Sequence, residues 1–245
     1  MPSLEILGIK INKVDNTSLL ELIKETLNGK NKIKISYANA NTANLAAKKP
    51  GFREHLNSFD IIHPDGVGIY LASKFLHKAG SFPTRFTGSD FYPILAKEAI
   101  KNKWKLFFFG HSNNTLEKIK SHYPALNICG YAEGYNFNPV KIANQVNNKN
   151  PDILVVGLGQ PLQEELILFY KNDFNCKVII AVGDGIKIFA GEKKRGPIFL
   201  QKIGMEWLAR YIHNPIKYFK RYIIGNPLFL YRIFRAKLSK FEIKP

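Results

Sequence analysis

Acidic residues, cysteines and long apolar runs are all scarce in this chain of 245 residues. Its 19 Asp and Glu stand against 36 Lys and Arg, so the formal net charge is +17. That excess favours an anionic partner, either a nucleic acid, a phosphorylated substrate or an acidic membrane surface. The two cysteines, Cys129 and Cys176, lack metal-ligand spacing and suit a reducing compartment.

Two further absences bear on location and metal content. No uninterrupted apolar stretch approaches the ~18 residues of a membrane-spanning helix, and MPSLEILGIKINKVD at the start lacks the pattern of a signal peptide. We therefore expect a cytoplasmic protein. Since the chain contains no Asp-x-Asp and no metal-spaced cluster of His, Cys and carboxylates, we expect no bound metal. Lysines, arginines and helix ends would then neutralise any bound diphosphate.

Apolar runs alternate with helical patterns along residues 1–195. The predicted strands are 33–37, 59–63, 105–110, 126–131, 152–159 and 177–185. The main predicted helices between them are 66–78, 91–102, 138–148 and 161–171. This alternation predicts the α/β fold class, a Rossmann-like, mainly parallel sheet with helices on both faces. Ligands of such sheets bind beyond the carboxyl ends of the strands.

The composition changes at residue 196, so we divide the chain into a Rossmann-like catalytic domain, 1–195, and a helical appendage, 196–245. From Lys193 onward there are 13 Lys and Arg but only 2 Glu. Helices are predicted over 198–213, 215–224 and 227–238. Their interleaved aromatic and basic residues favour a basic amphipathic appendage that binds a membrane surface. Nucleic-acid binding is the alternative, because stacking aromatics and cations serve that role as well.

Asp65, in HPDGVG, follows a predicted strand and precedes a predicted helix. It fits two roles, the N-cap of that helix or a general base toward a hydroxyl. Gly66 and Gly68 favour the second role because they let a ligand approach the backbone closely. Asp184 is a second carboxylate candidate, although its place between two glycines favours a turn.

Three more side chains at predicted strand ends or in loops have the chemistry of ligand contacts. Gln163 lies in GLGQPLQEE, where Leu162 replaces the third glycine of a dinucleotide fingerprint, but the helix start could still hold a pyrophosphate. Arg85 could clamp a phosphate or pair with Asp90 in its own loop. Asn39 could contact a sugar or a uracil, or serve the turn alone.

Taken in order, these motifs resemble the WecG/TagA/CpsF glycosyltransferase family over about residues 5–235. The motifs are Asn39 after the first strand, HPDGVG, RFTGSD, GLGQPLQEE, AVGDGIKIFAGEKKRGP and GMEWLARYIHNPIKYFKRY. The resemblance implies a UDP-sugar donor, commonly N-acetylmannosamine or its uronic acid. The acceptor would be a polyprenyl-diphosphate-linked sugar of cell-surface polysaccharide synthesis. It also implies inversion, no cofactor, no essential metal, and an appendage docked at the inner face of the membrane.

The same resemblance assigns roles to residues of this chain. Asp65 corresponds to the general base that takes the proton of the acceptor hydroxyl. Contacts to the donor nucleotide sugar are implied for Asn39, Arg85 and Gln163. Contacts to diphosphate are implied for the basic residues of the appendage, Arg210, Lys217, Lys220 and Arg221.

Two positions depart from the family pattern, Tyr37 in place of a usual Thr and Lys187 in place of a usual Asp. Both lie where donor contacts are expected, so the donor sugar stays open. The acceptor linkage and the choice between monomer and homo-oligomer stay open as well. The alternative function is that of a non-catalytic, nucleic-acid-binding α/β protein that uses the basic tail.

Overall fold

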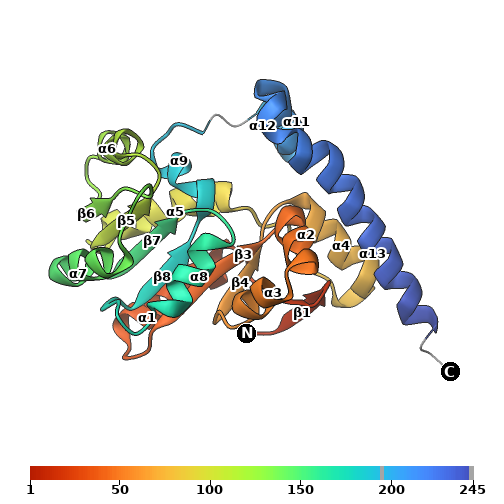
Figure 1. Cartoon of the computed structure of the whole chain (residues 1–245), viewed down its shortest axis with the longest axis horizontal. Coiled ribbons are helices and arrows are strands. Elements are labelled where there is room, and N and C mark those ends of the chain that lie inside the picture. Colours follow the sequence, from red (N-terminus) through yellow and green to blue (C-terminus); the bar gives the residue numbers. More distant parts are fainter. Residues whose placement is uncertain (194–195, 243–245) are drawn as a thin grey trace.

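The computed structural model describes residues 1–193 and 196–242 of the chain (Figure 1). Its centre is a six-stranded sheet in the order β4-β3-β8-β7-β5-β6, in which every neighbouring pair is parallel. The strands are β3 (Ile33–Ala38), β4 (Ile61–Pro64), β5 (Leu106–Gly110), β6 (Ile128–Ala132), β7 (Ile153–Gly157) and β8 (Val178–Ala181). The predicted parallel sheet is confirmed.

Successive side chains of the central strands alternate between two apolar layers, as strand geometry requires. In β5, Phe107 and Phe109 enter one buried cluster, whereas Leu106 and Phe108 enter the other. The first layer is covered by α2 (Ala40–Lys48), α3 (Pro50–Asn57), α7 (Pro139–Lys149) and α8 (Leu162–Phe169). The second is covered by α1 (Asn16–Asn28), α5 (Gly88–Lys101), α6 (Asn113–His122) and α9 (Ile186–Phe189). Helices therefore cover both faces, as predicted.

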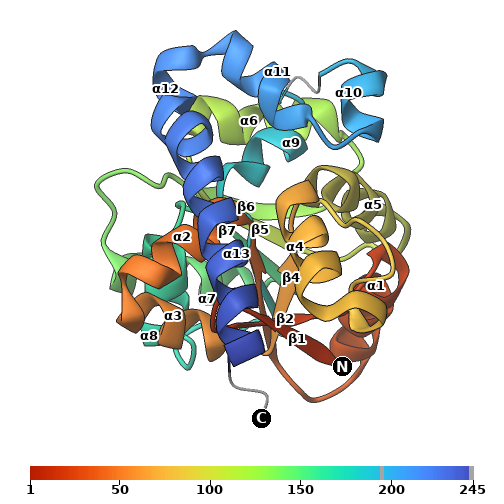
Figure 2. The ribbon, with the colours of Figure 1, turned by 90° about the vertical axis from the view of Figure 1, so that its right-hand side faces the viewer.

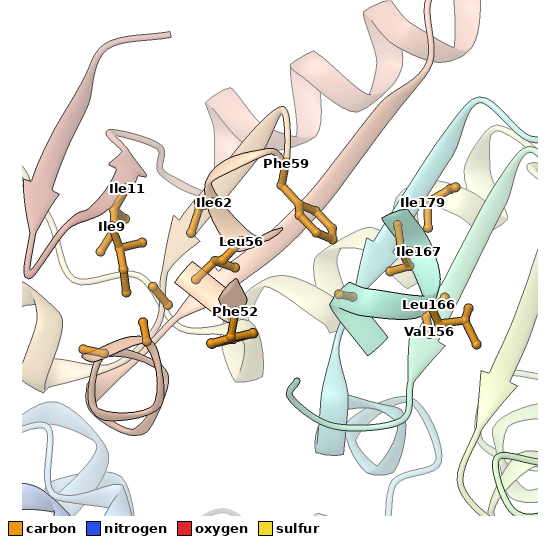
Figure 3. Close-up of a cluster of buried hydrophobic side chains, with 14 of the residues drawn as sticks. Ile9, Ile11, Phe52, Leu56, Phe59, Ile62, Val156, Leu166, Ile167 and Ile179 are labelled. Atoms are coloured by element: carbon orange, nitrogen blue, oxygen red, sulfur yellow. The ribbon is translucent and has the colours of Figure 1, made fainter. Parts of the chain in front are cut away.

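The first 32 residues hold elements that the sequence analysis did not assign. Strands β1 (Ser3–Ile6) and β2 (Ile9–Asn12) form an antiparallel hairpin. Its two turn residues, Leu7 and Gly8, both have positive φ, as tight hairpin turns require. Figure 3 shows Ile9 and Ile11 of this hairpin close to Leu56 and Ile62, so the hairpin extends the first apolar layer beyond β4.

Glycines end two strands earlier than predicted. The predicted strand 177–185 stops at Ala181, and the 3-10 helix η2 (Gly183–Gly185) follows it. Gly183 has φ +52°, which breaks the extended backbone. Strand β7 likewise ends at Gly157 rather than at residue 159, and Gly159 has φ +82°.

The appendage differs from the three predicted helices. Instead of one helix over 198–213 there are two, α10 (Ile198–Lys202) and α11 (Glu206–His213), because the backbone turns at Gly204 with φ +78°. The other two predicted helices form one uninterrupted run. It consists of α12 (Pro215–Phe219), the π-helical η3 (Lys220–Ile224) and α13 (Gly225–Glu242). Pro227 has no N–H for the carbonyl four residues earlier, and the wider π turn directly before α13 accommodates that loss.

Helix α13 is anchored to the sheet domain beside α2 and α4 (Val67–His77), as Figure 2 shows. Phe229 and Ile233 are buried in the first apolar layer. Asn44 of α2 donates from Nδ2 to the carbonyl of Gly225 at 2.7 Å, and its Oδ1 accepts from Nη1 of Arg232 at 2.6 Å. The first part of α13 is thus fixed against the core. The predicted domain boundary, between residues 195 and 196, adjoins residues 194–195, which lie outside the described residues.

Gly157 leads to a stability prediction. A Cβ at this position would meet Ile186 Cδ1 at 2.3 Å and the carbonyl oxygen of Gly183 at 2.7 Å, whereas a Cβ on Gly51 of α3 would meet nothing within 4 Å. We expect Gly157→Ala to lower the free energy of unfolding by about 1–3 kcal/mol through overpacking. Gly51→Ala, the matched control, should leave it unchanged or raise it by up to about 1 kcal/mol. Urea unfolding followed by circular dichroism measures both, and equal stability of the two variants would contradict the prediction.

Candidate active site

A crevice opens where two neighbouring strands send their chains to opposite faces of the sheet. Strand β3 continues into α2 on the first face, and the adjacent β8 continues through η2 into α9 on the second. Open parallel sheets bind ligands at such a switch point. Here it holds a cavity of about 530 Å³, a size that suits a small-molecule site. Residues after β3, β4, β7 and β8 line it together with the appendage.

Asp65 lies at this cavity, directly after β4. Its Oδ1 accepts the backbone N–H of Gly88 at 3.0 Å, and its Oδ2 accepts Nδ2 of Asn39 at 3.3 Å. The N-cap of α4 is Gly66, with φ +86°, and no side chain caps that helix. The alternative role of Asp65 as cap of the following helix is therefore wrong. The carboxylate instead joins the end of β4 to the starts of α2 and α5.

The surroundings of Asp65 keep it ionised. Burial by itself would raise the pKa of this carboxyl, but the Gly88 N–H, the charge of Arg210 and the Asn39 amide together lower the pKa below its ordinary value. Burial has the opposite effect on His63, two residues earlier: it lowers the pKa of the imidazole, so His63 contributes no charge at neutral pH. The cavity thus presents a carboxylate, which can accept a proton and has none to donate.

A chain of hydrogen bonds connects Asp65, through Asn39, to buried polar side chains of the interior. Asn39 caps α2 in a capping box with Thr42, and this fixes the amide that reaches Asp65. Thr42 donates from Oγ1 to Oε1 of Gln160 at 2.6 Å, and Gln160 donates from Nε2 to Oε1 of Glu164 at 3.1 Å. Burial raises the pKa of Glu164. The buried network therefore connects the start of α8 to the carboxylate at the cavity.

Gln163 lies beneath the cavity rather than on its surface. The side chain is fully buried, and its Oε1 accepts the backbone N–H groups of Gly183 at 3.0 Å and Gly159 at 3.3 Å. Its Nε2 donates to Glu164 at 2.8 Å. Gln163 thus holds the two glycine loops that follow β7 and β8. The neighbouring Gln160 lines the cavity in its place.

Among the described residues, four cations line the cavity: Arg85, Lys193, Arg210 and Arg221. Two of them have acidic partners, since Lys193 Nζ lies 3.6 Å from Asp184 Oδ2 and Arg210 Nη2 lies 3.3 Å from Glu206 Oε2. Burial and the nearby charge of Arg210 lower the pKa of Lys193 to about 8, although Asp184 acts in the opposite direction. The structure thus brings the predicted Asn39, Asp65, Arg85, Arg210 and Arg221 together at one cavity.

Lys217 and Lys220 lie on the exposed outer surface of the appendage, away from the cavity lining. Together with Pro215, Ile216 and Phe219 they border a shallow surface hollow. Nζ of Lys217 lies 5.5 Å from the ring centroid of Tyr218. Lys220 and Arg221 follow Lys217 by three and four residues, so a regular helix would place all three on one side. Of these three residues, only Arg221 lines the cavity.

Several lining residues were not singled out from the sequence. They are Thr87, Ser89, Tyr92, Gln160, Lys193, Trp207, Tyr218 and Tyr222. Ser89 and Thr87 belong to RFTGSD, and Gln160 belongs to GLGQPLQEE, so the motifs pointed to the correct loops. The only indication in the sequence that Lys193 lines the cavity was its position in the GEKKRGP segment. Tyr37, one of the two family departures, lines the cavity, whereas Lys187 is outside the lining.

Residues 1–193 and 196–242 lack two kinds of feature. Within these ranges no group of three or more His, Cys, Asp or Glu side chains is placed to hold a metal ion. No helix in the same ranges has the length and apolar character needed to span a membrane.

A doubly wound parallel sheet with a carboxylate and four cations at its switch point defines an α/β enzyme whose cavity suits a phosphorylated ligand. The comparison with known families is more specific. Residues 4–242 match the Glycosyl transferase WecG/TagA/CpsF family, and the chain belongs to it. The protein is therefore a glycosyltransferase, as the motifs indicated.

Three curated relatives carry the same name, N-acetylglucosaminyldiphosphoundecaprenol N-acetyl-beta-D-mannosaminyltransferase. The chain is 32% identical to the Bacillus spizizenii protein over 71% of this chain and 68% of that one. It is 31% identical to the Bacillus subtilis protein over 86% and 82%, respectively. The Staphylococcus aureus protein of strain MRSA252 is 29% identical over 95% and 92%.

The lowered pKa of Lys193 generates a pH prediction. Below pH about 8 its ammonium is charged and attracts an anion at the cavity, and above that pH the charge is lost. We expect the Kd of UDP, the leaving group that the family resemblance implies, to rise about tenfold between pH 7 and pH 9.5 in calorimetry, since one charge-assisted contact disappears. Lys193→Gln should bind more weakly at pH 7 and show a nearly flat profile. An unchanged slope in this variant would assign the pH dependence to another group.

Proposed function

We propose that this protein transfers N-acetylmannosamine or a related sugar from a UDP-sugar to a polyprenyl-diphosphate-linked sugar, with inversion and without an essential metal. The observation that carries the proposal is the ionised Asp65 at a cavity that four cations line. The shared name of the relatives supports the acceptor class and the type of sugar.

Asp65 acts as the general base in this proposal. The acceptor hydroxyl attacks the anomeric carbon of the donor, a new C–O bond forms, and the bond to the diphosphate breaks with UDP as leaving group. Asp65 takes the hydroxyl proton as the attacking oxygen loses electron density. A single displacement of this kind inverts the anomeric centre. Asn39 and the Gly88 N–H orient the carboxylate for the transfer.

The diphosphate is held by cations of the chain. Arg210 and Arg221 come from the appendage, whereas Arg85 comes from the loop before α5. Charge-assisted hydrogen bonds from guanidinium groups stabilise the developing charge on the leaving UDP. This arrangement supports a transfer that proceeds without a divalent ion.

The outer surface of the appendage docks on the membrane that holds the acceptor. Ile216 is 92% exposed, and Ile212 and Phe219 are exposed beside it. Lys217 and Lys220 flank these apolar side chains and face anionic headgroups. Exposed aliphatic residues among cations favour a lipid surface over a nucleic acid, which offers phosphates and bases but no hydrocarbon. The protein is thus peripheral at the inner face of the membrane.

Transfer from UDP-N-acetylmannosamine to a short-chain polyprenyl-diphosphate-N-acetylglucosamine tests the function and the role of Asp65. We expect the wild type to retain transfer in EDTA. Asp65→Asn should lower kcat by about 10²–10⁴ because the amide cannot accept the proton, while UDP binding and circular dichroism stay unchanged.

Asp184→Asn is the matched control, because Asp184 also lines the cavity but pairs with Lys193. Its effect should fall mainly on the KM of the donor. A kcat of Asp65→Asn near that of the wild type would remove the base assignment. The absence of transfer from any UDP-sugar would remove the proposed reaction, and full sensitivity to EDTA would remove only its metal-free part.

Flotation with anionic vesicles tests the membrane surface. Ile216→Asp should reduce the bound fraction about tenfold, because a carboxylate replaces an inserted apolar side chain and repels the headgroups. Val140→Asp is the control, since Val140 is an exposed apolar residue of α7 in the sheet domain. Binding of RNA or DNA in a gel shift, without binding to vesicles, would favour the nucleic-acid alternative instead.

A further inference from the structure

The cavity has one apolar side that continues onto the surface of the molecule. Among its lining residues, Val67 and Leu71 come from α4, and Phe229 and Leu230 come from α13. Leu71 is 56% exposed and Leu230 is 63% exposed. These two leucines therefore border both the cavity and the outer surface. They mark an apolar exit from the cavity, whereas the cations make the other part of its lining polar.

The exit continues along the surface where the two helices lie side by side, and the strip of this surface with the exposed Leu71 and Phe75 of α4 and Leu230 and Phe234 of α13 is called the groove below. Both helices start at the cavity, with Val67 and Gly68 in α4 and Asn226 in α13 among its lining residues. The exposed Phe75 follows Leu71 by one helical turn, and the exposed Phe234 follows Leu230 in the same way. Figure 2 shows α4 and α13 side by side.

A contact across the groove shows that its two walls stay close beyond the cavity. Nζ of Lys237 on α13 lies 5.6 Å from the ring centroid of Phe75 on α4. The apolar stripe from Val67 to Phe75 spans eight residue steps of helix, which is about 12 Å. On the neighbouring α13, Phe229 and Ile233 are buried in the first apolar layer.

The charges at the groove favour a lipid over a protein segment as its occupant. Helix α4 contains no acidic residue, and α13 contains only Glu242, its last residue. Lys74 of α4 lies over the ring of Tyr70, and Lys237 of α13 lies over the ring of Phe75. Cations beside an apolar stripe match the border between anionic headgroups and hydrocarbon.

We infer that the groove between α4 and α13 binds the first isoprene units of the acceptor's polyprenyl tail. This inference rests on the proposed function, in which the acceptor's reacting sugar lies at Asp65 and its diphosphate lies among the cations of the cavity. The tail must then leave the cavity, and Leu71 and Leu230 are the exposed apolar residues that connect the cavity with the surface. At about 12 Å the groove is shorter than the ~30 Å hydrocarbon core of a bilayer, so the rest of the tail stays in the membrane.

The test compares two soluble acceptors in the absence of membranes and detergent. One is N-acetylglucosamine diphosphate esterified to a chain of two or three isoprene units, and the other is its methyl ester. The wild type should have a lower KM for the tailed acceptor. In the double variant Phe75→Ser with Phe234→Ser, two exposed residues outside the cavity lining, this KM should rise about tenfold, while the KM of the methyl ester, the donor KM and kcat stay unchanged.

Phe169→Ser is the control, because Phe169 is 74% exposed on α8, on the first face of the sheet. It should leave both KM values unchanged. An equal KM change for the two acceptors in the double variant, or no change in either, would overturn the inference. If this surface only docks on bilayers, neither KM changes in the double variant, because the assay contains no bilayer.

Calorimetric binding of the two acceptors separates this inference from the proposed reaction. If the wild type transfers no sugar, the proposed function fails, but a tail-dependent affinity that the double variant loses would still support the groove. If transfer proceeds and the affinity for both acceptors is equal, the groove fails and the reaction stands.

Discussion

The hydrogen bond from the Gly88 N–H to Asp65 is the interaction on which the site depends. A carboxylate at the end of a buried strand loses most of its hydration, and it stays ionised only where fixed donors replace the lost water. Gly88 supplies one donor from the start of α5, and Asn39 supplies another from the start of α2. Because these helices lie on opposite faces of the sheet, the position of Asp65 requires that both layers are in place.

The parallel sheet makes this convergence possible, and the layer beneath the cavity makes it rigid. Gln163 accepts from the glycine loops after β7 and β8, and Gln160 connects Thr42 to the buried Glu164. Each of these polar groups would be costly if it were left without a partner in the interior. The network therefore has few alternative arrangements, and it restricts the orientation of Asn39, which in turn orients Asp65.

The sequence alone predicted which motifs follow the strands better than it predicted the orientation of individual side chains. Asn39 and Asp65 could be found because parallel strands bring their carboxyl ends to one edge, whereas Arg85 was found from its loop motif. Gln163 could not be placed correctly, since a Gln in the first turn of a helix has the same pattern whether it faces a ligand or two loops. The appendage was harder still, because the π turn at Lys220–Ile224 shifts the helical register. A regular helix of period 3.6 does not distinguish the inward Arg221 from the outward Lys217 and Lys220.

The appendage has two physical tasks that constrain each other. In the proposed function it brings Arg210 and Arg221 to an anionic ligand, and it leaves apolar side chains exposed for docking on a lipid surface. A helix that carried both on one face would place cations in hydrocarbon or apolar residues on phosphate. Gly204 and the π turn interrupt the regular helix, and the hydrogen bonds of Asn44 to Gly225 and Arg232 hold the start of α13 against α2. The irregular appendage thus brings Arg210 and Arg221 to the polar cavity and leaves Ile212, Ile216 and Phe219 exposed, which is what the proposed docking on a membrane requires.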